Sequence, residues 1–115
     1  MDGAAIVLAD RQGVISYWSE EAGVLFGYGA GDAVGRTLDL LVPEPLREAH
    51  WTGFRRAMRR PRLKDLAADL PVLCADGEVR TFAGRLVVVM DPLGAALGAM
   101  AIFARGVTTG VRPFG

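Results

Sequence analysis

Residues 10–38 read DRQGVISYWSEEAGVLFGYGAGDAVGRTL and carry the strongest structural signals of this 115-residue chain. Asp10 and Gly13 are turn residues, and they separate two runs rich in β-branched and aromatic side chains, AAIVLA (4–9) and VISYW (14–18). Runs of this kind joined by a short turn predict two antiparallel strands. The first predicted element is therefore a β-hairpin.

A predicted helix and a glycine-rich segment follow the hairpin. Ser19 is a suitable N-cap for EEAGVLFG, whose first turn holds acidic residues where the helix dipole favours negative charge. Gly27 can end this helix, because glycine adopts the left-handed backbone conformation without a steric penalty. Residues 29–41, GAGDAVGRTLDLL, predict short helical turns rather than one long helix.

The longest predicted helix spans Glu44–Arg59. Pro43 and Pro45 stand at its start, where the missing N–H of proline would have no partner, and Pro61 closes it. One face of this helix follows the i, i+4 spacing of a buried stripe. That face holds the only histidine of the chain and consists of Leu46, His50, Phe54 and Ala57 or Met58.

The second half of the chain changes to strand-like runs. Three of them, residues 65–74, 78–90 and 96–105, are joined by the turn sequences ADG (75–77) and DPLG (91–94). Strands, then helices, then strands again indicate the α+β class, with an antiparallel sheet that carries its helices on one face.

The composition limits the functions to consider. Hydrophobic residues make up 51% of the chain, which is enough for one domain with a core. The formal net charge is zero, so nothing suggests nucleic-acid binding. Cys74 is the only cysteine, which excludes an internal disulfide and fits a reducing, cytoplasmic location. No signal peptide, membrane span or catalytic motif is found, so we expect neither a membrane protein nor an enzyme.

Several residues of the first half resemble the pattern of the PAS domain family. PAS sequences usually carry an aromatic residue or Asn, a small residue, FGY and a glycine at the positions held here by Trp18, Ala22, Phe26, Gly27, Tyr28 and Gly35. The resemblance covers residues 3–109 and leaves residues 110–115 as a loose C-terminal tail. It implies the PAS fold, a five-stranded antiparallel sheet with helices on one face that enclose a pocket. PAS domains are commonly dimeric and serve signalling proteins by sensing a ligand or mediating assembly.

The last predicted strand departs from this pattern. Many PAS domains end in an Asp-Ile/Val-Thr motif that leads to an output helix, whereas this chain has Arg105-Gly106-Val107-Thr108. The following residues also lack the apolar heptads of a coiled coil. Either the output domain is reached by another route, or the chain is an excised sensor module.

His50 resembles the haem ligand of the PAS domains in oxygen-sensor kinases. Pro43, Arg47 and His50 reproduce the local pattern PEPxRxxH, and Arg56 stands where that group carries an arginine for a haem propionate. The resemblance implies haem b, with iron bound to the imidazole of His50. The chemistry is suitable, because imidazole is a common axial ligand of haem iron and guanidinium forms bidentate hydrogen bonds with carboxylates.

Other interpretations of His50 stay open. The arginine that those kinases place over the bound gas is absent near Ala68–Leu70, and Gly53 replaces an aromatic residue. His50 then becomes a hydrogen-bonded helix residue beside Trp51. In that case the domain senses an organic ligand, or it binds no ligand and acts as a dimerisation or protein-interaction module.

The strand after residue 77 supplies a predicted pocket wall. Alternation places Phe82, Gly84, Leu86 and Val88 on one face. A glycine inside a strand often marks a close approach to the backbone. At Gly84 the approaching group is either a ligand or a packed side chain such as Trp18 or Trp51, and we favour packing.

Two further features have structural interpretations. The cysteine that bonds flavin in light-sensing PAS relatives lies in an Asn-Cys-Arg helix motif, whereas Cys74 lies in a late strand. We therefore expect a small, half-buried apolar residue there. The arginines of residues 55–62 are expected to be solvated and to complement the C-terminal dipole of their helix.

The sequence therefore predicts a PAS sensor or regulatory module that is not itself an enzyme. It would bind a small ligand in the pocket between helix and sheet and pass the change to a signalling output domain of the parent protein. The segments LVVVM (86–90) and AMAIF (99–103) are apolar on both faces, which one covered face does not require. We therefore expect a homodimer formed through the outer face of the sheet or the first strand.

Overall fold

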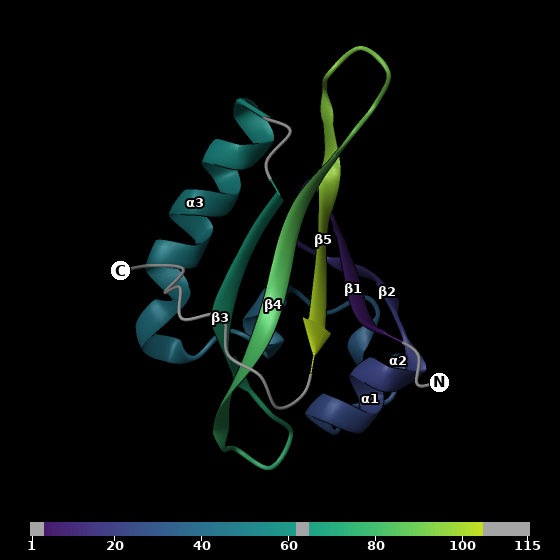
Figure 1. The fold of residues 1–115 in the computed structure, drawn as a ribbon, viewed down its shortest axis with the longest axis vertical. Helices are drawn as coiled ribbons and strands as arrows, with labels where there is room; N and C mark the ends of the chain where they lie inside the picture. The colour runs from purple at the N-terminus through teal and green to yellow at the C-terminus, as the bar shows by residue number, and fades with distance from the viewer. Residues whose placement is uncertain (1–3, 62–64, 105–115) are drawn as a thin grey trace.

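The computed structural model describes residues 4–61 and 65–104, which form a five-stranded antiparallel sheet in the order β2-β1-β5-β4-β3 (Figure 1). The strands are β1 (Ala5–Asp10), β2 (Ile15–Trp18), β3 (Asp65–Leu73), β4 (Val79–Met90) and β5 (Ala96–Ala104). The pairing of β1 with β5 brings the first and last strands together at the centre of the sheet. The predicted α+β class and PAS-like sheet are confirmed, whereas the predicted tail 110–115 and the segment 105–108 lie outside the described residues.

Helices connect the two groups of strands. They are α1 (Glu20–Phe26), α2 (Ala30–Ala33), the 3₁₀ turns η1 (Leu38–Leu40) and η2 (Glu44–Leu46), and α3 (Arg47–Arg59). The short helical turns predicted for residues 29–41 are confirmed. The helix predicted from Glu44 begins as a 3₁₀ turn and becomes α-helical at Arg47. Within the described part of the chain, no helix is long and apolar enough to span a bilayer.

Ser19 joins β1 to α1. Its Oγ accepts hydrogen bonds from the N–H of Ala22 (3.2 Å) and of Ile6 (2.8 Å), and its hydroxyl donates to the carbonyl of Ala4 (2.9 Å). The helix ends at Gly27, which has φ of 89°. A single side chain therefore caps the helix and also fixes its start against the neighbouring strand.

An aspartate begins each of the three hairpin turns by the same device. Asp10, Asp76 and Asp91 each accept hydrogen bonds through Oδ1 from backbone N–H groups two to four residues later. The guanidinium of Arg80 also donates to Asp76 and holds the pKa of that carboxyl at about 2. The prediction that Asp76 is a turn residue is confirmed.

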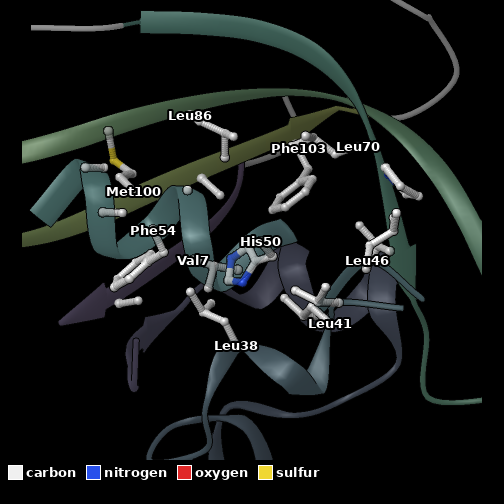
Figure 2. Close-up of a pocket in the computed structure, with 18 of the residues that line it drawn as sticks. Val7, Leu38, Leu41, Leu46, His50, Phe54, Leu70, Leu86, Met100 and Phe103 are labelled. Atoms are coloured by element: carbon white, nitrogen blue, oxygen red, sulfur yellow. The ribbon is translucent and has the colours of Figure 1, made fainter. Parts of the chain in front are cut away.

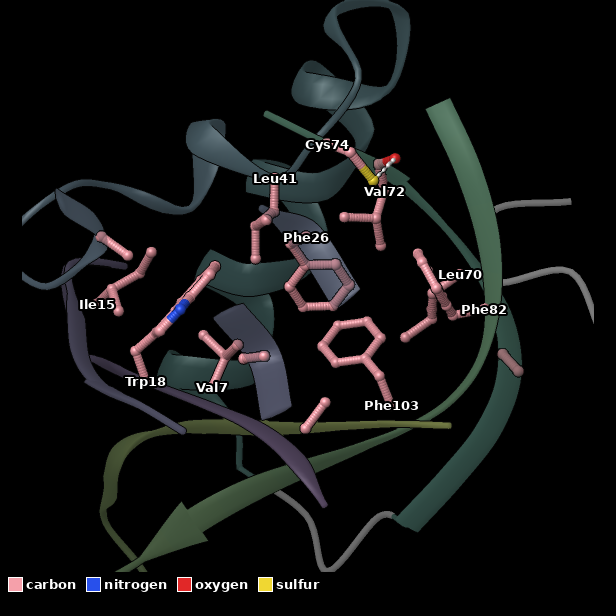
Figure 3. Packing of buried hydrophobic residues seen from close by; sticks show 14 residues of the cluster. Val7, Ile15, Trp18, Phe26, Leu41, Leu70, Val72, Cys74, Phe82 and Phe103 are labelled. Carbon is pink, nitrogen blue, oxygen red and sulfur yellow. Dashed lines mark hydrogen bonds between the residues drawn. The ribbon is translucent and has the colours of Figure 1, made fainter. Parts of the chain in front are cut away.

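The core is built around Phe26. Its ring makes edge-to-face contacts with Phe103, Phe82 and Trp18, at centroid distances of 4.9, 5.3 and 5.7 Å (Figure 3). Trp18 also donates a hydrogen bond from its indole N–H to the carbonyl of Tyr28 (2.9 Å). The FGY sequence and Trp18 thus form one packed unit between the sheet and α1, in which the buried indole nitrogen has a partner.

Replacing Trp18 should therefore destabilise the fold strongly. Trp18 is 4% exposed, whereas its neighbour Tyr17 is 47% exposed on the same strand. We expect Trp18→Ala to lower the free energy of unfolding by about 3 kcal/mol or more, because it leaves a cavity in the core. Tyr17→Ala should change it by less than about 0.5 kcal/mol. Urea unfolding of the two variants tests this, and equal small losses would contradict the structural role of Trp18.

Candidate functional site

A cavity of about 270 Å³ lies between α3 and the sheet (Figure 2). It is lined by Val7, Ala9, Leu38, Leu41, Val42, Pro43, Leu46, His50, Gly53, Phe54, Ala57, Leu70, Pro71, Val72, Leu86, Val87, Val88, Ala99, Met100, Ala101 and Phe103. Among these described residues, only His50 has a side chain that contains nitrogen or oxygen. The cavity is therefore an apolar chamber with one polar group in its wall.

The helical spacing of α3 explains why His50 faces the cavity. Leu46, His50 and Phe54 are four residues apart, so they form one stripe on the helix surface, and all three line the cavity. Figure 2 shows the imidazole in the middle of the lining, with Val7, Leu38 and Leu41 nearby. The buried face predicted for this helix is confirmed.

The imidazole of His50 is short of hydrogen bonds. Its Nδ1 atom is buried and has no partner among the described residues. The ring packs edge-to-face against Trp51 at 4.9 Å and lies 6.0 Å from Phe54. It therefore lies beside Trp51, as the structural interpretation predicted, but Nδ1 lacks the hydrogen bond that this interpretation expected.

The surroundings of His50 also set its charge. Burial lowers the pKa of the imidazole from its ordinary value, and the Asp39 carboxylate only partly offsets this effect. Removal from water disfavours the charged form more than one neighbouring carboxylate stabilises it. The imidazole is consequently neutral near pH 7 and has both a donor and an acceptor nitrogen.

Trp51 fixes the start of α3 to the rest of the protein. Its indole N–H donates to Oδ1 of Asp39 (2.7 Å), and its ring lies directly over Gly13 in the β1–β2 turn. Gly13 has φ of 79°, and a Cβ there would overlap the indole ring. Arg47 adds hydrogen bonds to the carbonyls of Val42 (3.1 Å) and Asp39 (3.4 Å). These contacts of Trp51 and Arg47 fix the N-terminal half of α3, which carries His50, to the β1–β2 turn and the η1 region.

The sheet residues predicted for the pocket wall are divided between two places. Leu86 and Val88 line the cavity, whereas Phe82 and Gly84 do not, because they belong to the core behind it. At Gly84 an added Cβ would overlap the side chain of Leu70 on β3. Packing, the interpretation we favoured, therefore explains this glycine, although the packed residue is Leu70 and neither tryptophan.

Arg56 does not accompany His50. It lies six residues further along α3, is exposed, and is not among the residues that line the cavity. At 3.6 residues per turn, this spacing places it on another side of the helix. Of the predicted site residues, the structure therefore brings His50 and Leu86 to one cavity and leaves Arg56, Phe82 and Gly84 outside it.

Haem fits this cavity only in part. The neutral imidazole is a suitable iron ligand, and its Nδ1 has no competing partner. Apart from His50 itself, the lining offers no cationic or hydrogen-bonding side chain to the propionates, since Arg56 is outside it. For a free metal ion, which needs several protein ligands, the described residues contain no cluster of three or more His, Cys, Asp or Glu side chains.

Cys74 is part of the core and not of the cavity. It is 3% exposed, and its thiol contacts the carbonyl of Val72 at 3.8 Å. The prediction of a small apolar role is confirmed, with burial more complete than expected.

Comparison with known proteins places this architecture in a family. The family model described as the PAS fold matches residues 3–105. The chain belongs to the PAS family. PAS domains are sensor modules, so this chain is a sensory domain with its cavity at the helix–sheet boundary.

Solved PAS structures share this fold at low sequence identity. A PAS domain from Colwellia psychrerythraea has 24% identity, covers 91% of this chain and 86% of its own, and gives a TM-score of 0.77. The PAS domain of the Cronobacter turicensis quorum-sensing receptor RpfR, in complex with BDSF, has 15% identity, coverages of 90% and 94%, and a TM-score of 0.71. A light-oxygen-voltage domain studied with a flavin analogue has 20% identity, coverages of 90% and 78%, and a TM-score of 0.68.

Protonation of His50 should destabilise this PAS domain. Its pKa is lower in the folded chain than the value of about 6.5 expected when unfolded, so the unfolded chain takes up the proton first as the pH falls. The stability that His50 contributes is present above about pH 6.5 and is lost as the pH falls from there through the folded-state pKa.

Urea unfolding near neutral pH and in mild acid, with His50→Leu as the matched variant, measures this effect. Wild type should lose more stability on acidification than His50→Leu, which has nothing to protonate at this position. Equal losses would mean that the imidazole is solvated in the folded state.

Proposed function

We propose that this PAS domain senses a small, mainly apolar organic molecule bound between α3 and the sheet. The observation that supports it is the cavity of about 270 Å³, whose lining side chains are apolar except for His50. An apolar cavity of about 150 Å³ stays dry and accepts benzene. The larger cavity here, close to the lower end of the range for ligand pockets, suits a ligand somewhat larger than one aromatic ring.

The PAS relatives are consistent with this proposal. The RpfR PAS domain has structures with BDSF and with C12:0, and its coverage of this chain is 90% in both cases. A cavity in the same fold, open to apolar molecules, is a natural place for an acyl or aromatic ligand in this chain. Binding there changes the packing of α3, and the parent protein's output domain would respond to that change.

Thermal unfolding with a panel of medium-chain alcohols, acids and bicyclic aromatics tests the proposal. A ligand that binds only the folded state raises the midpoint in proportion to the logarithm of its concentration. Ala57→Leu should reduce this stabilisation, because it extends a side chain into the cavity from α3. Ala30→Leu, at an exposed position on α2, is the matched control and should leave it intact. Absence of any stabilisation across the panel would refute the proposal.

A haem-based gas sensor is the second candidate. The neutral imidazole of His50 in the wall of the cavity favours it, because imidazole is a common axial ligand of haem iron. The apolar lining and the exposed position of Arg56 oppose it, because the propionates would lack partners. Absorption spectra after haem addition decide between the candidates. A sharp Soret band that His50→Ala abolishes would establish haem, and broad, equal spectra for both proteins would exclude it.

We also propose that the outer face of the sheet forms a homodimer. Ile6 pairs with Ile102 across β1 and β5, and Leu8 lies two residues along β1. All three are half-buried and alternate with the buried residues that face the core, so they form an apolar strip on the opposite face. A strip of this kind can pair with its own copy across a two-fold axis.

Analytical ultracentrifugation at high micromolar concentration tests the dimer. Wild type should sediment as a dimer, and Ile102→Glu as a monomer because it places a charge in the apolar strip. Thr52→Glu, exposed on α3 and away from the outer face of the sheet, should remain dimeric. A monomeric wild type would overturn this proposal and favour sensing without self-assembly.

A further inference from the structure

We infer that the ligand is a neutral molecule with one hydrogen-bonding group on an apolar body, and that the imidazole of His50 anchors this group. The pocket would then discriminate against the carboxylate form of a ligand of the same length. This inference rests on the proposed function, because it names the chemical class of the ligand that the cavity accepts.

The first argument is the unsatisfied imidazole. A buried polar atom without a hydrogen-bond partner is unfavourable, and Nδ1 of His50 is such an atom. His50 lines the cavity and its outer torsion is broad and roughly two-fold, so rotation of the ring can turn a nitrogen toward a bound ligand. A hydroxyl, carbonyl or amide of the ligand can pair with the neutral imidazole as donor or acceptor. The other side chains of the lining are apolar and would contact the apolar body of the ligand.

The second argument concerns charge. A carboxylate that enters an apolar cavity loses its hydration and needs a cation or several donors in return. The lining contains no lysine or arginine, and burial keeps the imidazole of His50 neutral near pH 7. The nearby charge that acts on the imidazole is the negative carboxylate of Asp39. An anionic ligand would therefore be both unpaired and repelled.

Arg47 does not supply the missing cation. Its guanidinium donates to the backbone carbonyls of Val42 and Asp39, and its Nε lies 4.0 Å from Oδ1 of Asp39. These contacts direct its charge to the η1 region, and Arg47 is not among the residues that line the cavity. The positive charge closest along α3 to His50 is thus already engaged outside the pocket.

Isothermal titration of the purified chain with 1-octanol and with sodium octanoate near neutral pH tests the inference. The two probes share their length and differ in head-group charge. We expect octanol to bind at least about tenfold more tightly than octanoate. His50→Phe keeps an aromatic ring of similar size but removes both nitrogens, and it should weaken octanol binding by about tenfold. His50→Gln, which retains a donor and an acceptor, should recover part of this loss.

Nuclear magnetic resonance gives a second, independent readout. His50 is the only histidine of the chain, so the nitrogen-15 signals of the imidazole need no assignment by mutagenesis. Octanol should shift these signals in wild type, as expected for a new hydrogen bond. A shift confined to backbone amides would overturn the anchoring role even if octanol binds.

The other outcomes separate the two proposals. Octanoate that binds as tightly as octanol would overturn the inference on charge and leave the apolar-ligand function standing. An unchanged octanol affinity in His50→Phe would overturn the anchor alone. Absence of binding by both probes, together with no stabilisation by the wider panel of alcohols, acids and aromatics, would overturn the inference and the proposed function together.

Discussion

The edge-to-face contacts of Phe26 hold this structure together. Its ring, on α1, touches Trp18 of β2, Phe82 of β4 and Phe103 of β5, which are elements from both ends of the chain. These rings fill one end of the space between the helices and the sheet (Figure 3). The other end lies under α3, where mainly aliphatic side chains, together with His50 and Phe54, line the cavity and do not fill it.

Most of the fold was predictable because its determinants are local. Asp10, Asp76 and Asp91 each specify a turn through hydrogen bonds to residues at most four positions away, and Ser19 caps the helix that follows it. Signals of this range can be recognised in a single sequence. The contacts that orient α3 are different. Trp51 contacts Gly13 and Asp39 only in the folded chain, and no short sequence pattern predicts contacts between residues so far apart.

The candidate site was predictable only where helical periodicity applies. His50 faces the cavity because it belongs to the stripe of Leu46 and Phe54. Phe82 and Gly84 share the face of β4 with Leu86, yet the strand is long and its face passes from core to cavity along its length. Alternation gives the face of a strand residue and not its position along that face. Arg56 was assigned to the site only by resemblance to haem-binding PAS domains. Its six-residue spacing from His50 places it on another side of α3, outside the cavity.

Two local departures from good packing coincide at the same place. Elsewhere in the described residues, no other buried side-chain nitrogen or oxygen lacks a hydrogen-bond partner. Under α3 the chain leaves both a void and an unpaired imidazole, and each is unfavourable by itself. One molecule can relieve both, since its apolar body fills the void and its polar group pairs with His50. A site that is deficient in two ways, both corrected by the same kind of ligand, is better explained by selection for binding than by imperfect packing.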